Sequence, residues 1–195
     1  MSRTGSTLCL LLVLLLMPGC KGEAPPPSAP QGAPKGLAPL GAPGATDPGT
    51  DRIRTLKGRL NGDPRNVELL GALADAYFEA RRYPEAIPLY ERALAIAPGD
   101  ADLLNDLGLS RFYLGKGADA LAAVTAATEA DPAFKHAWLS KGFILLSMGR
   151  LDEAVAPLNK VKELDPAGPL AETADDFLEK IEAARGEPPR EPPAR

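Results

Sequence analysis

The sequence predicts an all-α protein: an α-solenoid of three helical hairpins with a capping helix at each end. Apolar residues follow a helical period over most of residues 51–185, and hydrophobic residues make up 45% of the chain. Three sets of residues also recur at a fixed spacing of 34: Pro98, Pro132 and Pro166; Ala86, Ala120 and Ala154; Ala74, Gly108 and Gly142. A period of this length is typical of stacked two-helix units.

Residues 1–19 predict a secretory signal peptide. Arg3 supplies a positive start, and Leu8 to Met17 is an apolar run of ten residues. Crossing a bilayer takes about 20 residues, so this run is too short to span it.

The end of this run, Gly19-Cys20, resembles the signal of bacterial lipoproteins. The resemblance implies that Cys20 is linked to diacylglycerol, and acyl chains at this site would form a durable membrane anchor. Lys21 follows, rather than the Asp that retains many such proteins in the inner membrane. The resemblance therefore implies an outer-membrane, periplasmic-face location in the cell envelope. An uncleaved signal anchor, or a secreted protein with an incidental Cys20, is the alternative.

Residues 20–50 predict a tether that follows the anchor. Residues 21–50 hold eight Pro, six Gly and six Ala, a composition that buries too little apolar surface to offset the entropy of ordering. Such a stretch reaches roughly 30 Å as a flexible coil and about 90 Å in full extension. A second Pro-rich stretch, residues 187–195, is interpreted as a solvated tail.

The repeats occupy residues 67–100, 101–134 and 135–168, and they resemble the tetratricopeptide repeat. Small residues on both helices of each unit allow close approach of the two backbones. Gly115 and Gly149 fall where the chain must reverse. Asp131-Pro132 and Asp165-Pro166 stop the second helices, because Pro disfavours a helical residue before it.

Two further segments flank the repeats. Residues 51–66 predict a half-repeat whose helix covers 51–62, and residues 169–186 predict a final helix over 169–185. Each would cover the open apolar face of an end repeat, which a solenoid requires.

The sequence offers no catalytic, cofactor-binding or metal-binding site, so an enzyme is not expected. His136 is the single histidine, and both cysteines, Cys9 and Cys20, lie in the first twenty residues. The net charge of −4 argues against a nucleic-acid partner, which needs a basic surface.

The resemblance to tetratricopeptide repeats implies a concave groove, lined by the first helix of each unit, that binds a protein or peptide. The groove positions carried over from the family are Glu68, Asp75, Phe78, Glu79, Asp102, Asn105, Asp106, Leu109, Phe112, Tyr113, His136, Leu139, Phe143 and Leu146. They are acidic toward the N-terminal end and apolar toward the C-terminal end, which favours a partner that is basic at one end and apolar at the other. The Lys, Asn and Arg pattern of family members that grip acidic peptides is absent. Alternatively, the capping helix covers Leu139, Phe143 and Leu146.

The function expected from these features is a membrane-anchored interaction module, scaffold or assembly factor in the bacterial cell envelope. Two sharper alternatives stay open: a pilotin-like lipoprotein that assists a secretin, a type IV pilus or another outer-membrane complex, and a docking subunit for an enzyme that acts on peptidoglycan. The sequence leaves the oligomeric state open.

Overall fold

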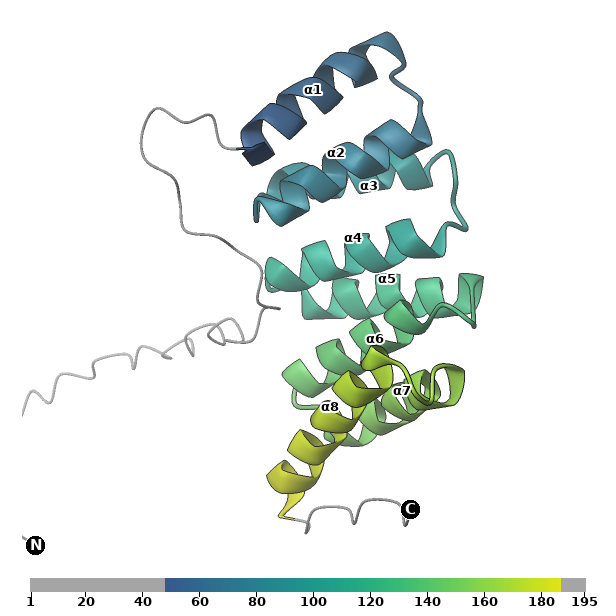
Figure 1. Ribbon diagram of the computed structural model, residues 1–195. Coiled ribbons are helices and arrows are strands. Elements are labelled where there is room, and N and C mark those ends of the chain that lie inside the picture. Colours follow the sequence, from purple (N-terminus) through teal and green to yellow (C-terminus); the bar gives the residue numbers. More distant parts are fainter. Residues whose placement is uncertain (1–47, 187–195) are drawn as a thin grey trace, which may run out of the picture.

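The computed structural model describes residues 48–186, which form eight α-helices and no strand (Figure 1). The helices are α1 (Pro48–Gly62), α2 (Val67–Glu79), α3 (Tyr83–Leu94), α4 (Ala101–Tyr113), α5 (Gly117–Ala130), α6 (Lys135–Ser147), α7 (Leu151–Leu164) and α8 (Pro169–Arg185). The predicted all-α solenoid is confirmed. The signal peptide, Cys20, the tether as far as residue 47 and the tail over 187–195 lie outside the described residues. Within 48–186, no helix is long and apolar enough to cross a membrane.

The helices pack as three consecutive hairpins, α2 with α3, α4 with α5 and α6 with α7. We call α2, α4, α6 and α8 the first helices, and α3, α5 and α7 the second helices. The backbones of neighbouring first helices come close along the stack, whereas between 48 and 186 the backbones of neighbouring second helices do not. Because the first helices are closer together, the stack curves toward them, and their exposed side is its concave face.

Each hairpin is close-packed through its small residues. A Cβ atom on Gly142 of α6 would lie 2.5 Å from Leu158 Cδ2 of α7, and one on Gly108 of α4 would lie 2.5 Å from Val124 Cγ1 of α5. Both distances are well inside van der Waals contact. Small residues are therefore required here because the two helices of each hairpin pack closely against each other at these positions.

The turn inside each hairpin uses a left-handed residue at the same register. Gly115 and Gly149 have φ values of +77° and +74°, as expected for chain reversal. The first hairpin has Arg81 at this position, with φ of +57°, which the sequence interpretation did not anticipate. A side chain there carries a steric cost that glycine avoids.

The ends of the stack are covered as the sequence predicts. In α1, Ile53, Leu56 and Leu60 are buried, and the helix begins at residue 48 rather than at the expected 51. In α8, whose bounds match the expectation, Leu178 and Ile181 are buried against α7 and α6. The two caps complete the hydrophobic clusters at the two ends of the stack.

Candidate partner-binding surface

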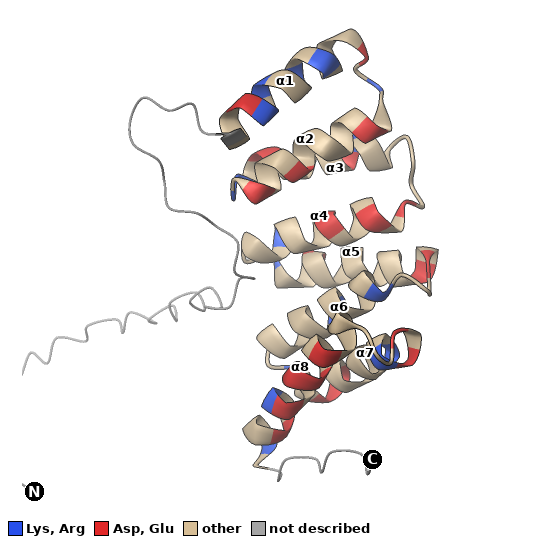
Figure 2. Cartoon of the chain, viewed as in Figure 1, with Lys and Arg blue, Asp and Glu red and all other residues tan. Residues whose placement is uncertain are grey.

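Three aspartates of the first two hairpins form an acidic patch on the concave face. Asp102 and Asp106 are one turn apart on α4, and Asp75 of α2 is close enough for its charge to act on Asp106. Figure 2 shows acidic positions on both α2 and α4. Partial burial, reinforced by the negative charges of Asp102 and Asp75, raises the pKa of Asp106 to about 7. Burial raises the pKa of Asp75 as well. A cationic partner at this patch would therefore stabilise the ionised form of its carboxylates.

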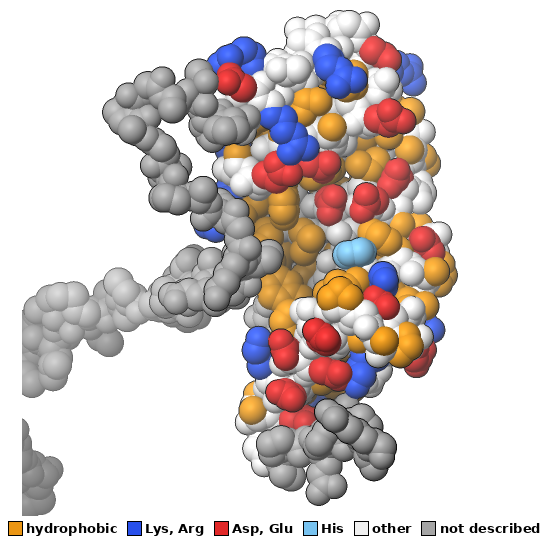
Figure 3. Space-filling model, in the orientation of Figure 1, with side chains coloured by type: hydrophobic (Ala, Val, Ile, Leu, Met, Phe, Trp, Pro, Cys, Tyr) orange, Lys and Arg blue, Asp and Glu red, His pale blue; other side chains and the backbone are white. Residues whose placement is uncertain are grey.

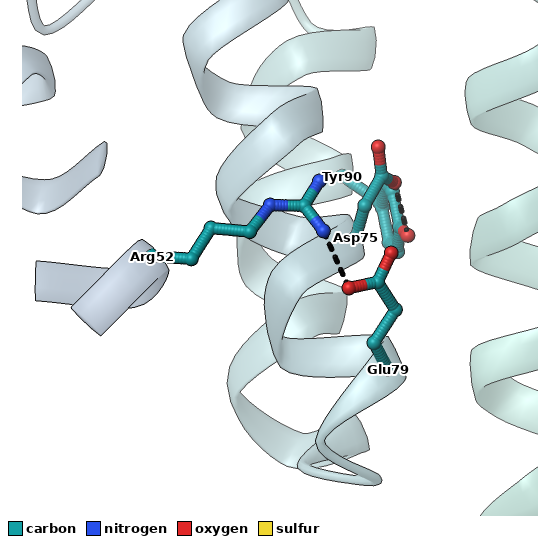
Figure 4. Close-up of polar contacts among 4 residues, drawn as sticks. All are labelled: Arg52, Asp75, Glu79 and Tyr90. Atoms are coloured by element: carbon teal, nitrogen blue, oxygen red, sulfur yellow. Dashed lines mark hydrogen bonds and ion pairs between the residues drawn. The ribbon is translucent and has the colours of Figure 1, made fainter. Parts of the chain in front are cut away.

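A buried tyrosine bonds to an aspartate of this patch, and an exposed arginine pairs with a glutamate beside it (Figure 4). Tyr90 Oη, from the second helix of the same hairpin, donates a hydrogen bond to Asp75 Oδ1 at 2.7 Å. Arg52 Nη1 of α1 lies 2.5 Å from Glu79 Oε2 at the end of α2. Glu79 was expected to contribute free negative charge, but its charge is shared with Arg52. Glu68 is exposed in the first turn of α2.

Asn105 lies beneath the patch rather than on its surface. Its side chain is only 5% exposed, and Nδ2 donates a hydrogen bond to Asp106 Oδ1 at 3.0 Å. The bond helps to fix the orientation of the Asp106 carboxylate and lowers the pKa of that group, against the larger effect of burial. Asn105 is therefore a supporting residue of the patch and not part of its accessible surface.

Six aromatic side chains continue the concave face as an aromatic strip. In order of ring contact they are Tyr83, Phe78, Tyr113, Phe112, Phe143 and Phe177. Successive ring centroids lie 5.1–5.8 Å apart, and Tyr83 also stacks on Tyr113 at 5.1 Å. Tyr113 is 37% exposed, and the other five are partly exposed. Figure 3 shows hydrophobic side chains gathered next to acidic ones on this face of the molecule.

The third hairpin meets the capping helix α8 at this surface. Leu139 and Leu146 are partly buried and pack against the cluster formed by α6, α7 and α8. The ring of Phe143 stacks on Phe177 of α8 at 5.8 Å, so the capping helix covers part of it. Leu109 is partly exposed on α4, and His136 is exposed with its ring 5.5 Å from that of Phe134.

Some residues of this surface were absent from the sequence prediction. Tyr83 and Tyr90 belong to a second helix, whereas only first helices were considered. Phe177 belongs to the final helix and lies 34 residues after Phe143, so extending the repeat spacing by one unit identifies it. Arg52 could not be found this way, because its contact with Glu79 joins α1 to the end of α2.

The groups on this surface are suited to binding another molecule. The acidic patch presents hydrogen-bond acceptors, and the aromatic strip presents apolar area beside them. Within residues 48–186, no group of three or more His, Cys, Asp or Glu side chains could hold a metal ion.

The tetratricopeptide repeat family model matches residues 54–101 and 105–169, which together span more than half of the chain. A curated relative, small glutamine-rich tetratricopeptide repeat-containing protein 2 of Mycosarcoma maydis, is 29% identical over 105 residues. That alignment covers 54% of this chain but only 30% of the relative, so this chain matches less than a third of the relative's length.

Solved structures share the fold. MamA superposes with a TM-score of 0.64 at 22% identity, over 73% of this chain and 86% of MamA. The first tetratricopeptide domain of Spaghetti (RPAP3), bound to the HSP90 peptide SRMEEVD, gives 0.58 at 25% identity, covering 62% of this chain and 96% of that one. The TPR2B domain of yeast Sti1, in a pHsp70 complex, gives a TM-score of 0.59 at 23% identity, covering 61% of this chain and 98% of that one.

Proposed function

The chain belongs to the tetratricopeptide repeat family, and we propose that its concave face binds a protein segment that is basic at one end and apolar at the other. Members of this family are typically non-catalytic protein-interaction modules. The observation that carries the proposal is the junction of the acidic patch and the aromatic strip on α2 and α4. Phe78 lies one turn after Asp75, and Phe112 lies between one and two turns after Asp106. A bound segment can therefore contact both regions within a few residues.

The acidic patch supports the choice of a basic partner. The negative charge of Asp102 adds to the cost of ionising Asp75 and Asp106, and a Lys or Arg side chain placed among these carboxylates relieves it. Converging like charges also speed encounter with a cationic segment. The HSP90 peptide bound by the Spaghetti domain, SRMEEVD, has three acidic residues at its C-terminal end. A peptide of that charge would be repelled here, so this surface suits the opposite class of ligand.

The aromatic strip supports the apolar half of the ligand. Aromatic side chains supply large contact areas with few rotatable bonds, and they are enriched among residues that dominate binding energy. Tyr113 is the most exposed of the six and stacks on Tyr83. Once a segment has been steered to the patch, burial of its apolar side chains on Phe112 and Tyr113 would slow its release.

The proposed setting is the cell envelope, with the folded module held to a membrane by Cys20. The Gly19-Cys20 pair after an apolar run supports this setting, and the Pro-rich stretch that follows gives the module reach. Anchoring predicts that Cys20→Ser releases the protein from membranes or leaves it unprocessed. Mass spectrometry of the wild-type N-terminus tests it directly, and an unacylated N-terminus cleaved at another position contradicts the anchoring.

The binding proposal is tested with a peptide library screened on the whole chain, followed by kinetics of the selected peptides. Enriched ligands should carry Lys or Arg beside apolar residues. Glu68→Lys with Asp102→Lys, two exposed changes on the concave face, should slow association and flatten its salt dependence, because they reverse the steering field. Phe112→Ala should mainly speed dissociation.

The matched control is Asp119→Lys with Glu129→Lys, which makes the same charge change at exposed positions of the second helix α5. This control should leave the association rate within about twofold of the wild type. Selection of acidic peptides, or equal effects of the two double variants, would show that the ligand does not use the concave face.

A further inference from the structure

The chain enters the fold beside one end of the aromatic strip. Arg52, in the first turns of α1, is 2.5 Å from Glu79, and Glu79 directly follows Phe78 of the strip. Figure 1 shows the start of α1 next to the C-terminal end of α2, and Figure 4 shows Arg52 reaching Glu79. The polypeptide therefore enters α1 close to the Phe78 end of the strip.

The preceding sequence carries an apolar pattern that suits such a surface. Pro34, Leu37, Leu40 and Pro43 recur at every third residue. A polyproline II helix has three residues per turn, so these four side chains would lie along one face of it. Leu37 and Leu40 are also the only large aliphatic residues between 21 and 47, and this stretch has no aromatic residue.

We propose that residues 34–43 of this chain bind the aromatic strip as a polyproline II segment, with Leu37, Leu40 and Pro43 against the rings. Aromatic-lined surfaces are the usual receptors for this conformation, because Pro pre-sets the backbone and less entropy is lost on binding. The occupant is thus a defined part of the same molecule.

The dimensions of the two partners agree. From Phe78 through Tyr113, Phe112 and Phe143 to Phe177 there are four ring-to-ring steps, each of 5.1–5.8 Å. That path corresponds to at most about seven residues of polyproline II, at ~3.1 Å per residue. The stretch from Leu37 to Pro43 has this length. Residues 44–47 remain to join it to α1, whose first turns lie at the Phe78 end.

Covalent attachment makes a weak contact sufficient. A short linker holds a tethered segment at an effective concentration in the millimolar range, so an intrinsic dissociation constant of that order already gives substantial occupancy. A partner that binds as in the proposed function, on which this step rests, must displace residues 34–43 before its apolar residues reach Tyr113 and Phe112. Binding of the segment itself does not depend on any partner.

Hydroxyl-radical footprinting of the full chain, read residue by residue with mass spectrometry, tests this occupancy without a partner. Leu37→Asn with Leu40→Asn should raise the oxidation rates of Phe112 and Tyr113 at least twofold. Trp138 and Met148, which lie outside the strip, should keep their rates and serve as internal references. Both substitutions fall outside the helical repeats, so the packing of the hairpins stays intact.

The matched control keeps the composition and breaks only the spacing: Leu37→Ala with Ala38→Leu, and Leu40→Ala with Ala42→Leu. Loss of the three-residue period should expose the strip as the Asn variant does, whereas Ala29→Asn with Ala33→Asn should leave it covered. Equal strip oxidation in the wild type and the Asn variant overturns the proposal.

A second measurement follows the protease accessibility of residues 34–43 themselves. Trypsin cleavage after Lys35, relative to cleavage after Lys21 in the same chain, should speed up several-fold in Tyr113→Ser, which leaves the cleaved segment unaltered. An unchanged ratio contradicts the proposal. Protection that weakens on dilution places the segment on a second copy of the chain and overturns binding within one molecule. Failure of the peptide-library screen would leave both readouts unaffected, so the two proposals fail separately.

Discussion

Tyr90 Oη donates a hydrogen bond to Asp75 Oδ1 at 2.7 Å, which connects the buried interior of the first hairpin to the acidic patch on the concave face. Tyr90 is almost completely buried, and burial is the main cause that raises its pKa. The neutral hydroxyl is therefore a permanent donor to Asp75. The bond also lowers the pKa of Asp75, in opposition to the effect of burial.

Tyr90→Phe should lower the free energy of unfolding by about 1–2 kcal/mol, because a partly buried carboxylate loses its donor. It should also raise the pKa of Asp75 further. Urea denaturation and carboxylate titration by NMR measure the two effects. Tyr113→Phe, which removes a hydroxyl from an exposed ring, is the control and should change stability by less than about 0.5 kcal/mol. A loss as large in the control as in Tyr90→Phe would contradict this role.

Gly142→Ala should destabilise the third hairpin by about 1–3 kcal/mol, because the new Cβ would overlap Leu158 and force α6 and α7 apart. Gly58→Ala is a matched substitution inside α1, where a Cβ has no atom within 4 Å. It should stabilise the protein by about 0.5–1 kcal/mol through helix propensity. Chemical denaturation of both variants provides the comparison, and a shift of the same sign in the two would refute the close approach.

Arg81→Gly should raise the free energy of unfolding by about 0.5–1 kcal/mol. Arg81 has a positive φ at the register where the other two hairpins have Gly115 and Gly149, and glycine relieves the steric cost. The reciprocal change, Gly115→Ala, should destabilise by a similar amount. Thermal unfolding followed by circular dichroism measures both. Destabilisation by Arg81→Gly would show that side-chain contacts of Arg81 outweigh its backbone conformation.

Asp106 makes stability depend on pH. Its pKa is about 7 in the folded chain and 3.8 without the fold, so between these values the folded state retains a proton that the unfolded state has lost. Stability is therefore greatest below about pH 4 with respect to this group, and it falls as the pH rises toward 7. Asp106→Asn removes this penalty and should be more stable than the wild type by about 1–3 kcal/mol at pH 8, with the difference vanishing near pH 4. A difference that does not change with pH would contradict the burial of this carboxylate.

The same carboxylate should make ligand binding depend on pH. A cationic side chain at the patch favours the ionised form of Asp106, so binding expels its proton. Affinity for a basic peptide should therefore increase as the pH rises from 6 to 8. Asp106→Asn should weaken binding at pH 8 and flatten this dependence, whereas Asp119→Asn on α5 should retain it. Calorimetric titrations in two buffers of different ionisation enthalpy report the proton release.

The linear pattern of the sequence was enough to predict the helical stack. Each hairpin was predicted from residues that recur every 34 positions, namely Pro98, Pro132 and Pro166 with small residues at matched positions. The two caps were predicted because the end repeats would otherwise leave an apolar face open. This works because every unit meets only its neighbours, so local periodicity specifies the packing. The same periodicity predicted the glycines of the later turns. It did not reveal the positive φ of Arg81, because arginine carries no signal for that conformation.

The concave surface was only partly predictable from the sequence. The resemblance to tetratricopeptide repeats implied that Asp75, Asp106 and Phe112 share a face, but it did not show that Asn105 lies below that face. Only the tertiary structure joins Tyr90 to Asp75 and Arg52 to Glu79, because these contacts pair residues of different helices. Burial and neighbouring charge, which set the pKa of Asp106, likewise arise only when α2, α3 and α4 come together. Spacing along one helix determines which side chains share a face, whereas their burial and ionisation depend on what the other helices place against that face.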